Sequence, residues 1–363
     1  MSSTQTSTGP YEGTSRRWGA ALAVLLGGVL YFISFPAPDM WPLAWVALAP
    51  FFAGSAAMRT WKSAAIGGLV AGLVANLPAF SWVASVTVPG WIALSLYVSL
   101  FWVPCAVGVR WFYRRCPGLW FLGAAALWAG LEFLRTWLAP GFPWLFLGYT
   151  QWRLLPLVQV SSLVGVYGVS FVVALVGAGL AYAWMETMDE AGAALSRRVA
   201  VVGLSLLVAV AGYGWGRYAL GGVEYTDGPV VGVVQQNIPR SVADYTTQSY
   251  DEFCAEAIDE IEKAESLSLQ LPQGVDLVVW PETTVQAPMN IHPALISDER
   301  LRGVLERGLE AVRKVGGKLN APVLAGTRGW FPRSEGYVDN TARREVRHVA
   351  NSAMLFSPQG EFL

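Results

Sequence analysis

Seven apolar segments lie within the first 218 residues of this chain of 363. A helix needs about 20 mostly apolar residues to cross the roughly 30 Å of a membrane's hydrocarbon core, and each segment comes close to that length. The first two are short and are joined by the proline-rich stretch SFPAPDM, so they could instead form a re-entrant pair. We therefore expect a cytoplasmic tail over 1–17 and a bundle of about seven transmembrane helices over 18–218. The segments are 18–35, 41–58, 64–83, 91–112, 118–138, 157–185 and 199–215.

The rest of the chain has the composition of a soluble domain. The whole sequence is 54% hydrophobic, above the roughly 45 to 50% of soluble domains. The part up to Tyr218 holds 12 Lys/Arg, 6 Asp/Glu and 15 of the 17 Trp, whereas the part after it holds 13 Lys/Arg and 20 Asp/Glu. We expect a separate, mildly acidic domain over 221–363. It has no basic stripe for phosphates, so nucleic acid is not an expected partner.

Basic residues in the loops predict the orientation. Loops rich in Lys and Arg stay in the cytoplasm, which places the N-terminus there. After an odd number of spans the second domain emerges on the other side, which in a bacterial inner membrane is the periplasm. A cleaved signal peptide is the alternative for the first segment, but six further spans favour a retained helix. Nine basic residues lie in one set of loops and two, Arg135 and Arg153, in the other; the nine are Arg16, Arg17, Arg59, Lys62, Arg110, Arg114, Arg115, Arg197 and Arg198.

The cysteines and histidines form no recognisable site. Cys105 and Cys116 lie in or beside an apolar segment, and Cys254 recurs with apolar residues at helical spacing, so a packed core thiol is expected. His292 and His348 are isolated, and no Cys/His spacing fits zinc. We expect no disulfide framework, no metal and no cofactor.

The second domain alternates strand-like and helix-like segments. Buried strands are predicted over 228–238, 275–280, 321–327 and 352–358. An amphipathic helix surrounds Phe253, and a second runs from a cap at Ser297 to Gly316 and Gly317. This order predicts an α/β layer with helices covering the sheet.

The stretch VDLVVWPETT places one carboxylate, Glu282, directly after a strand expected to be fully buried. Functional groups collect at the carboxyl ends of strands in such sheets. Trp280 and Pro281 would partly desolvate this carboxylate, which suits it to proton transfer near neutral pH. The alternative is a turn or helix cap that accepts backbone N–H bonds.

Short motifs in both halves resemble known families. WPET, with VVQQNIP before it and VLAGT and NSAMLFSPQGE after it, resembles the nitrilase (carbon-nitrogen hydrolase) superfamily. FPAPDMWPLAWVALAPFF, WAGLEFLRTWLAPGFPWLFLGYTQ and LVGVYGVSF resemble the apolipoprotein N-acyltransferases, in which a polytopic bundle carries a nitrilase-like domain outside the inner membrane. The resemblance covers nearly all of the chain.

The resemblance implies an αββα nitrilase fold with a catalytic triad of Glu, Lys and Cys. The Cys thiolate takes a fatty acyl chain from a phospholipid as a thioester and passes it to the α-amino group of the diacylglyceryl-cysteine of a lipoprotein. Glu282 matches the position of the general base, and the Lys would stabilise the oxyanion. The implied partners are the phospholipid donor and the lipoprotein N-terminus, and a monomer is expected.

The C-terminal part departs from the family pattern. The family's Lys follows the PQGE strand and its Cys lies further on, whereas this chain stops at Leu363. Lys314, Lys318 and Cys254 lie in the wrong context. The expectation is a C-terminally truncated, incomplete nitrilase-like domain without a last membrane helix, which is inactive as given.

The membrane half supplies candidate substrate contacts. Ionisable residues are expensive at membrane depth, so Glu132 and Arg135, three residues apart, are expected either to pair or to line a lipid cavity. Gln151 belongs to the same matching stretch. Tyr245 lies roughly where the family places a functional aromatic residue, although that residue is a Trp in the family. The expected substrate-binding residues are Glu132, Arg135, Pro143, Trp144 and Tyr245.

Two other functions remain open from the sequence. The second domain alone would allow a membrane-tethered amidase or nitrilase, but such a hydrolase of soluble amides needs no lipid-accessible bundle such as GFPW suggests. A remnant without activity, or a transporter-like protein, is the other class. Transporters show broken membrane helices in repeated halves, and this sequence does not.

Overall fold

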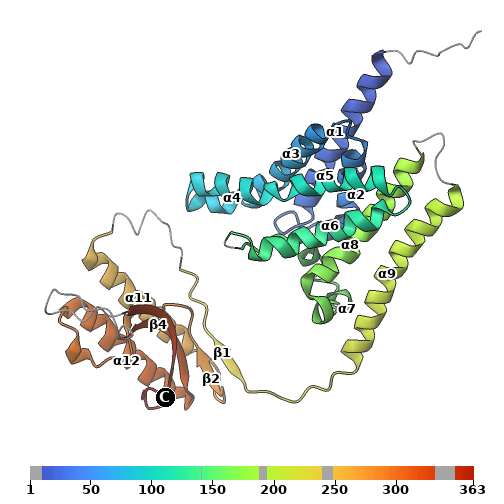
Figure 1. Cartoon of the computed structure of the whole chain (residues 1–363). Coiled ribbons are helices and arrows are strands. Elements are labelled where there is room, and N and C mark those ends of the chain that lie inside the picture. The colour runs from blue at the N-terminus through green and yellow to red at the C-terminus, as the bar shows by residue number, and fades with distance from the viewer. Residues whose placement is uncertain (1–9, 140, 188–193, 239–247, 332–347) are drawn as a thin grey trace, which may run out of the picture. The chain divides into compact units, whose positions relative to one another are not determined.

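The computed structural model describes residues 10–139, 141–187, 194–238, 248–331 and 348–363 (Figure 1). The chain forms two compact units, Met1–Glu224 and Tyr225–Leu363. The first is helical, and the second holds a five-stranded sheet with helices. Tyr245 lies outside the described residues.

Helices form over every apolar segment of the first unit. One of them, α8, is broken where Val164 and Gly165 leave helical geometry, Gly165 with φ 67°. Short 3-10 turns lie between several helices, η1 (Trp41–Leu43), η2 (Ser81–Ser85) and η3 (Leu147–Gln151). The helices are α1 (Pro10–Ile33), α2 (Ala44–Ala57), α3 (Trp61–Ala79), α4 (Val88–Leu100), α5 (Trp102–Arg115), α6 (Trp120–Trp137), α7 (Leu155–Val158), α8 (Ser161–Thr187) and α9 (Leu195–Gly221).

Four helical stretches in the described part of the chain are long and apolar enough to cross a membrane. They are Trp61–Ala79, Val88–Arg115, Ser161–Thr187 and Leu195–Gly221. Two further apolar stretches, Gly19–Ile33 and Trp41–Ala57, are shorter. The first unit is therefore that of a membrane protein, and the number of seven spans stays a prediction.

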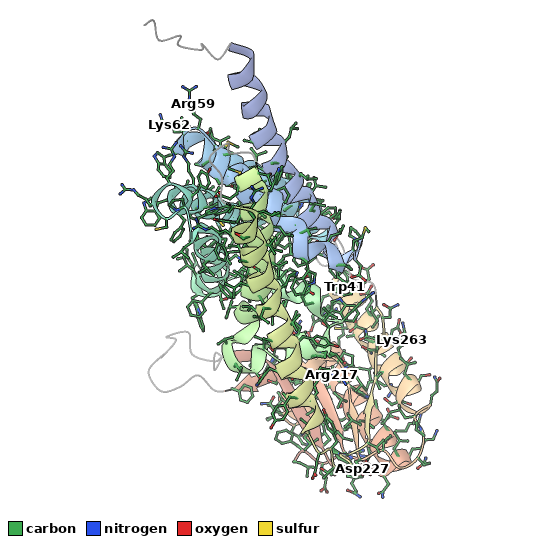
Figure 2. The ribbon with its side chains drawn as sticks, turned by 90° about the vertical axis from the view of Figure 1, so that its right-hand side faces the viewer. Trp41, Arg59, Lys62, Arg217, Asp227 and Lys263 are labelled. Carbon is green, nitrogen blue, oxygen red and sulfur yellow. The ribbon has the colours of Figure 1, made fainter. Side chains whose placement is uncertain are left out.

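Small residues and one arginine hold the helices of this unit together. A Cβ at Gly28 would lie 2.5 Å from the carbonyl oxygen of Ala71, so α1 and α3 approach as closely as glycine allows. The buried guanidinium of Arg110 donates to the carbonyl oxygens of Met58 and Arg59, just after α2. Arg59 and Lys62 lie at one end of this unit, and Trp41, in η1 just before α2, lies towards the other (Figure 2).

The second unit is a mixed sheet with two long helices. The strand order is β1-β2-β4-β3, all parallel, and β5 pairs antiparallel with β4. Helices α11 and α12 pack against each other beside the sheet (Figure 1). The elements are β1 (Val231–Val233), α11 (Tyr250–Ser268), β2 (Leu277–Val279), β3 (Val285–Pro288), η4 (Pro293–Leu295), α12 (Glu299–Leu319), β4 (Val323–Phe331) and β5 (His348–Phe356).

Several predicted boundaries were wrong. The cap of α12 is Asp298 rather than Ser297, because the Asp298 carboxylate accepts the backbone N–H of Leu301. The helix continues through Gly316 and Gly317 to Leu319, and its C-cap Asn320 adopts the left-handed conformation with φ 51°. Strand β3 was not predicted, and β1 and β2 are shorter than expected.

The two faces of the sheet differ in burial. Gly232 and Val278 are register partners on the buried face, and Val278 is fully buried. On the opposite face Val233 is 70% exposed, and its register partner Val279 is only half-buried. The prediction of a fully buried strand before Glu282 was therefore wrong, since β2 is buried on one face only.

Candidate functional site

Glu282 lies in the turn that connects the end of β2 to β3. The preceding Trp280 is buried, and its indole N–H donates to the Ser268 hydroxyl on α11 at 2.9 Å. Glu282 itself is exposed. Trp280 therefore anchors the turn to α11, while Glu282, two residues later, is exposed.

The Glu282 carboxylate has a specific partner on β5. The side-chain amide N–H of Asn351 donates to Glu282 Oε1, and the Thr283 hydroxyl donates to Asn351 Oδ1 at 3.3 Å. Thr283 adopts a positive φ of 55°, which is uncommon outside glycine. These bonds fix both the carboxylate and the turn that carries it.

Gly326 on β4 lets the turn lie directly against the sheet. A Cβ at this position would lie 2.8 Å from the Glu282 Cα and 2.8 Å from the Thr283 nitrogen. Any side chain there would push the turn away. The glycine in VLAGT is thus required by the close approach of the Glu282 backbone.

The expectation that Trp280 and Pro281 desolvate Glu282 was wrong, because its side chain is exposed. Trp280 points into the core with 3% exposure, and the carboxylate points away from it into an exposed position. Among the described residues, the hydrogen-bond partner of the carboxylate is the side-chain amide of Asn351 rather than a backbone N–H group. The role as general base stays a prediction.

In the described part of the chain, Cys254, Lys314 and Lys318 have partners other than Glu282. Cys254 is 5% exposed on α11, as predicted for a core thiol, and burial raises its pKa. Lys314 forms an ion pair with Glu265 at 2.6 Å, and Lys318 donates to the Leu269 carbonyl at 3.0 Å. The two lysines thus link α12 to α11, and Cys254 belongs to the core of this unit.

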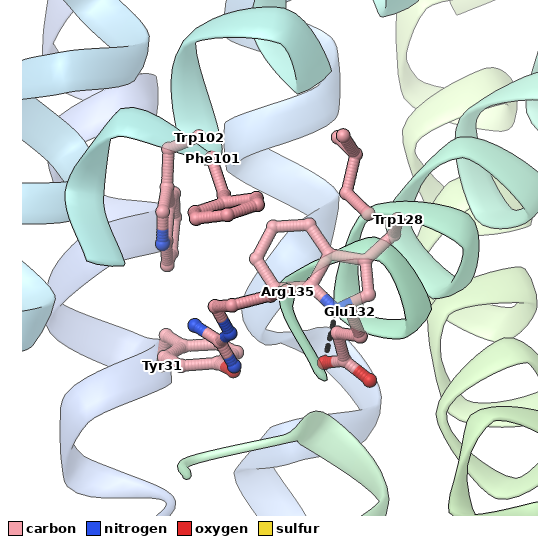
Figure 3. Close-up of a pocket in the computed structure, with 7 residues that line it drawn as sticks. Tyr31, Phe101, Trp102, Trp128, Glu132 and Arg135 are labelled. Atoms are coloured by element: carbon pink, nitrogen blue, oxygen red, sulfur yellow. Dashed lines mark hydrogen bonds between the residues drawn. The ribbon is translucent and has the colours of Figure 1, made fainter. Parts of the chain in front are cut away.

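The helical unit contains a pocket with two charged side chains (Figure 3). Aromatic rings form most of its wall, with Trp102 and Trp128 edge to face at 4.9 Å. The lining residues are Tyr31, Phe101, Trp102, Trp128, Leu131, Glu132 and Arg135.

Glu132 and Arg135 both line this pocket, and each is 4% exposed. Glu132 Oε1 accepts the Trp128 indole N–H and the Leu147 backbone N–H, both at 2.8 Å. Arg135 donates to the Trp144 carbonyl oxygen at 2.8 Å, and its guanidinium lies 4.8 Å above the Phe146 ring. Each of the two charged side chains therefore has a hydrogen bond to the backbone of the segment that follows α6.

The other predicted membrane residues lie in or near that segment. Pro143 and Trp144 are exposed, Trp144 by 51%. The Trp144 ring stacks on Phe142 at 5.8 Å and lies 6.2 Å from Trp82. Gln151 is fully buried and donates to the Thr150 hydroxyl, so its amide serves local structure.

Comparison with known proteins identifies the family. Residues 27–179 match the model of the apolipoprotein N-acyltransferase N-terminal domain. A protein named apolipoprotein N-acyltransferase from Geobacter metallireducens is 33% identical over 310 residues, which cover 81% of this chain and 56% of the relative. The chain belongs to the apolipoprotein N-acyltransferase family.

Two further relatives of the same name agree with this assignment. That of Azotobacter vinelandii is 30% identical over 289 residues, covering 74% of this chain and 51% of the relative. That of Pseudomonas aeruginosa is 31% identical over 285 residues, covering 74% of this chain and 52% of the relative. The chain thus spans about half the length of the curated apolipoprotein N-acyltransferases that it matches.

Three residues that hold Glu282 or the segment after α6 in place were not predicted from the sequence. Asn351 stands in NSAMLFSPQGE and Gly326 in VLAGT, two motifs that carried the resemblance without a role for either residue. Tyr31 is 3% exposed and donates to the Leu145 carbonyl at 2.6 Å, but it is an ordinary aromatic residue of an apolar helix in the sequence. These contacts join residues that are far apart in the sequence, so they become visible only in the folded structure.

Proposed function

We propose that this protein is an N-acyltransferase of lipoprotein maturation, which moves a fatty acyl chain from a phospholipid to the α-amino group of a lipoprotein's diacylglyceryl-cysteine. The observation that carries the proposal is the exposed Glu282 carboxylate, held by Asn351 at the end of a parallel strand. The names of the relatives support the same activity.

Glu282 acts as the general base in this proposal. Transfer to an amine requires that the α-ammonium group lose a proton before its nitrogen can attack the acyl carbonyl carbon. An exposed carboxylate with a fixed orientation can accept that proton, and the new amide bond forms as the acyl carrier leaves. Asn351 binds one carboxylate oxygen, which leaves the other for the proton.

The second unit is proposed to have a nitrilase-like fold. The parallel strands β1, β2 and β4, together with α11 and α12, support this proposal, because one half of an αββα sandwich is such an α/β layer. The open apolar face, with Val231 and Val233 exposed, is the kind of surface that a second sheet covers in such a sandwich. The proposed domains are the tail 1–17, the membrane bundle 18–218 and the nitrilase-like part 221–363.

The membrane unit is proposed to hold the acyl donor. Glu132 and Arg135 line its pocket. Pro143 and Trp144, a few residues later in the sequence, present exposed apolar surface. Tyr245 remains a proposed substrate contact. We further propose a monomer in the bacterial inner membrane, with the N-terminus in the cytoplasm and the second unit in the periplasm.

The orientation is tested with reporter fusions after Gly221. A reporter active only in the periplasm is expected to give signal there, because the basic loops favour the cytoplasm. Signal from a cytoplasm-only reporter at the same fusion point would reverse the proposed orientation.

The activity is tested by mass spectrometry of a diacylated lipopeptide. The protein, expressed from its natural coding region, is incubated with phospholipid and the lipopeptide. A mass gain of one fatty acyl chain on the α-amino group is the expected result. The competing amidase activity would instead release ammonia from small amides and leave the lipopeptide unchanged, and that pattern would overturn the proposal.

A further inference from the structure

The segment that follows α6 is held by three polar side chains from two helices. It leaves the helix through Gly141, with φ 102°, and turns again at Leu145, with φ 52°. Between these turns lie the exposed Pro143 and Trp144, and after them Phe146 is fully buried. Exposed and buried residues thus follow one another closely in this segment. Its backbone N–H and C=O groups lie outside a helix or sheet, so the buried ones need hydrogen-bond partners from side chains.

Three side chains from two helices supply those partners. Tyr31 on α1 donates to the Leu145 carbonyl oxygen at 2.6 Å. Arg135 on α6 donates to the Trp144 carbonyl at 2.8 Å and more weakly to that of Leu145 at 3.4 Å, and Glu132 accepts the Leu147 N–H at 2.8 Å. We call Tyr31, Glu132 and Arg135 the clamp.

The clamp groups are themselves rigidly placed. The Tyr31 ring packs edge to face on Trp102 at 5.1 Å and on Trp128 at 5.4 Å, and the Trp128 indole bonds Glu132 (Figure 3). Arg135 and Tyr31 approach the same Leu145 carbonyl from different helices. One oxygen of Glu132 and one N–H group of Arg135 are bonded to the backbone of 144–147, which offsets part of the cost of burying two ionisable side chains. The other carboxylate oxygen, Oε2, and the Arg135 Nε are buried without a hydrogen-bond partner among the described residues.

We propose that Tyr31, acting with Glu132 and Arg135, is a positioning residue that fixes the orientation of Trp144 for the phospholipid acyl donor. The hydroxyl of Tyr31 binds the residue next to Trp144, and Trp144 has 51% of its surface exposed, stacked on Phe142. A planar indole fixed in this way offers a preorganised apolar surface, and preorganisation lowers the entropy lost when a ligand binds. The identity of the ligand rests on the proposed function, whereas the clamp itself does not.

The test compares Tyr31→Phe with Tyr182→Phe in the full chain in detergent micelles. The first substitution removes one hydroxyl from the clamp and keeps the ring. The second removes a hydroxyl from an equally buried tyrosine, 1% exposed, whose ring packs on Trp120 and Phe121 instead. Amide hydrogen exchange over residues 142–149 is expected to rise about tenfold in Tyr31→Phe, as the loss of one buried hydrogen bond predicts, and to stay unchanged in Tyr182→Phe. Equal exchange in both variants would overturn the clamp.

A second measurement addresses the ligand. Dioleoylphosphatidylglycerol is titrated into the same samples, and its protection of residues 142–149 from exchange is followed. The half-saturating lipid concentration is expected to rise several-fold in Tyr31→Phe only. Loosened exchange with an unchanged lipid midpoint, or no lipid protection in the unaltered chain, would overturn the positioning role while leaving the clamp in place.

A kinetic readout separates this proposal from the proposed function. If the protein transfers acyl chains, Tyr31→Phe should raise the KM for phospholipid several-fold with kcat nearly unchanged. An equal fall of kcat at constant KM would contradict a role in donor binding. Absence of acyl transfer in the unaltered protein would count against the proposed function, and the exchange and lipid measurements would still decide the clamp.

Discussion

The side-chain amide of Asn351 donates a hydrogen bond to the carboxylate of Glu282, which lies 69 residues earlier in the sequence. The Thr283 hydroxyl completes the link by donating to the Asn351 carbonyl oxygen. The bond joins the turn after β2 to strand β5. The orientation of the candidate base therefore depends on the pairing of β5 with β4.

Replacing Asn351 should release the Glu282 carboxylate. In Asn351→Leu the carboxylate loses its fixed donor, so a water-soluble carbodiimide should modify Glu282 several-fold faster, as measured by peptide mass mapping. Glu306, an exposed carboxylate on α12, serves as the internal reference. Asn351→Gln, which keeps an amide donor, should restore part of the protection. An unchanged modification rate in Asn351→Leu would mean that the bond does not hold the carboxylate in solution.

Adding one methyl group at Gly326 should displace the same turn. A Cβ there would lie 2.8 Å from the Glu282 Cα, and overpacking of this kind costs about 1 to 3 kcal/mol. Gly326→Ala should therefore lower the stability of the second unit and reduce acyl transfer. Gly303→Ala on α12 is the matched control, since no atom lies within 4 Å of its added Cβ. Normal stability and transfer in Gly326→Ala would refute the close approach.

The ion pairs of Glu265 should make the contact of α11 with α12 pH-dependent. Burial alone would raise the pKa of Glu265, but the hydrogen bonds from Lys314 and Arg307 outweigh it and hold the pKa below the ordinary value of 4.5. A lowered folded-state pKa contributes stability that is present above pH 4.5 and is lost as the pH falls through the folded-state pKa.

We expect Glu265→Gln to lower the free energy of opening of α11 and α12 by about 2 kcal/mol at pH 7, measured by hydrogen exchange. The difference from the unaltered chain should shrink as the pH falls below 4.5. Glu262→Gln should change stability by under about 0.5 kcal/mol, because Glu262 is 56% exposed and its pair with Arg307 is screened by water. A difference that persists in acid would contradict the electrostatic account.

Cys254 should not carry an acyl chain. Burial raises its pKa, and a thiol that is 5% exposed and mostly protonated at neutral pH is a poor nucleophile. Incubation with phospholipid should therefore give no hydroxylamine-labile adduct at this residue, and Cys254→Ser should leave any acyl transfer unchanged. Mass detection of such an adduct on the Cys254 peptide would show that the assignment of this thiol to the core is wrong.

The sequence predicted the elements better than the contacts between them. Hydrophobic periodicity and capping residues located both long helices near α11 and α12, and apolar length located the membrane helices, since these signals are local. The exposure of Glu282 could not be predicted in this way, because Trp280 turns towards Ser268 while the next residues turn away. The same limit applies to Glu132 and Arg135, whose spacing suggested either a pair or the lining of a cavity. Both side chains line one pocket, but their bonds to the backbone of the segment that follows α6 could not be predicted.

The most direct test of the account is acyl transfer by Glu282→Gln in the protein expressed from its natural coding region. Glutamine keeps the shape and most hydrogen bonding of glutamate but cannot accept the proton of the incoming amine. Transfer of a fatty acyl chain to a diacylated lipopeptide is predicted to fall about 10²-fold or more, with membrane insertion unchanged and with Glu306→Gln retaining full activity. Turnover close to that of the unaltered protein in Glu282→Gln would contradict the assignment of Glu282 as the general base.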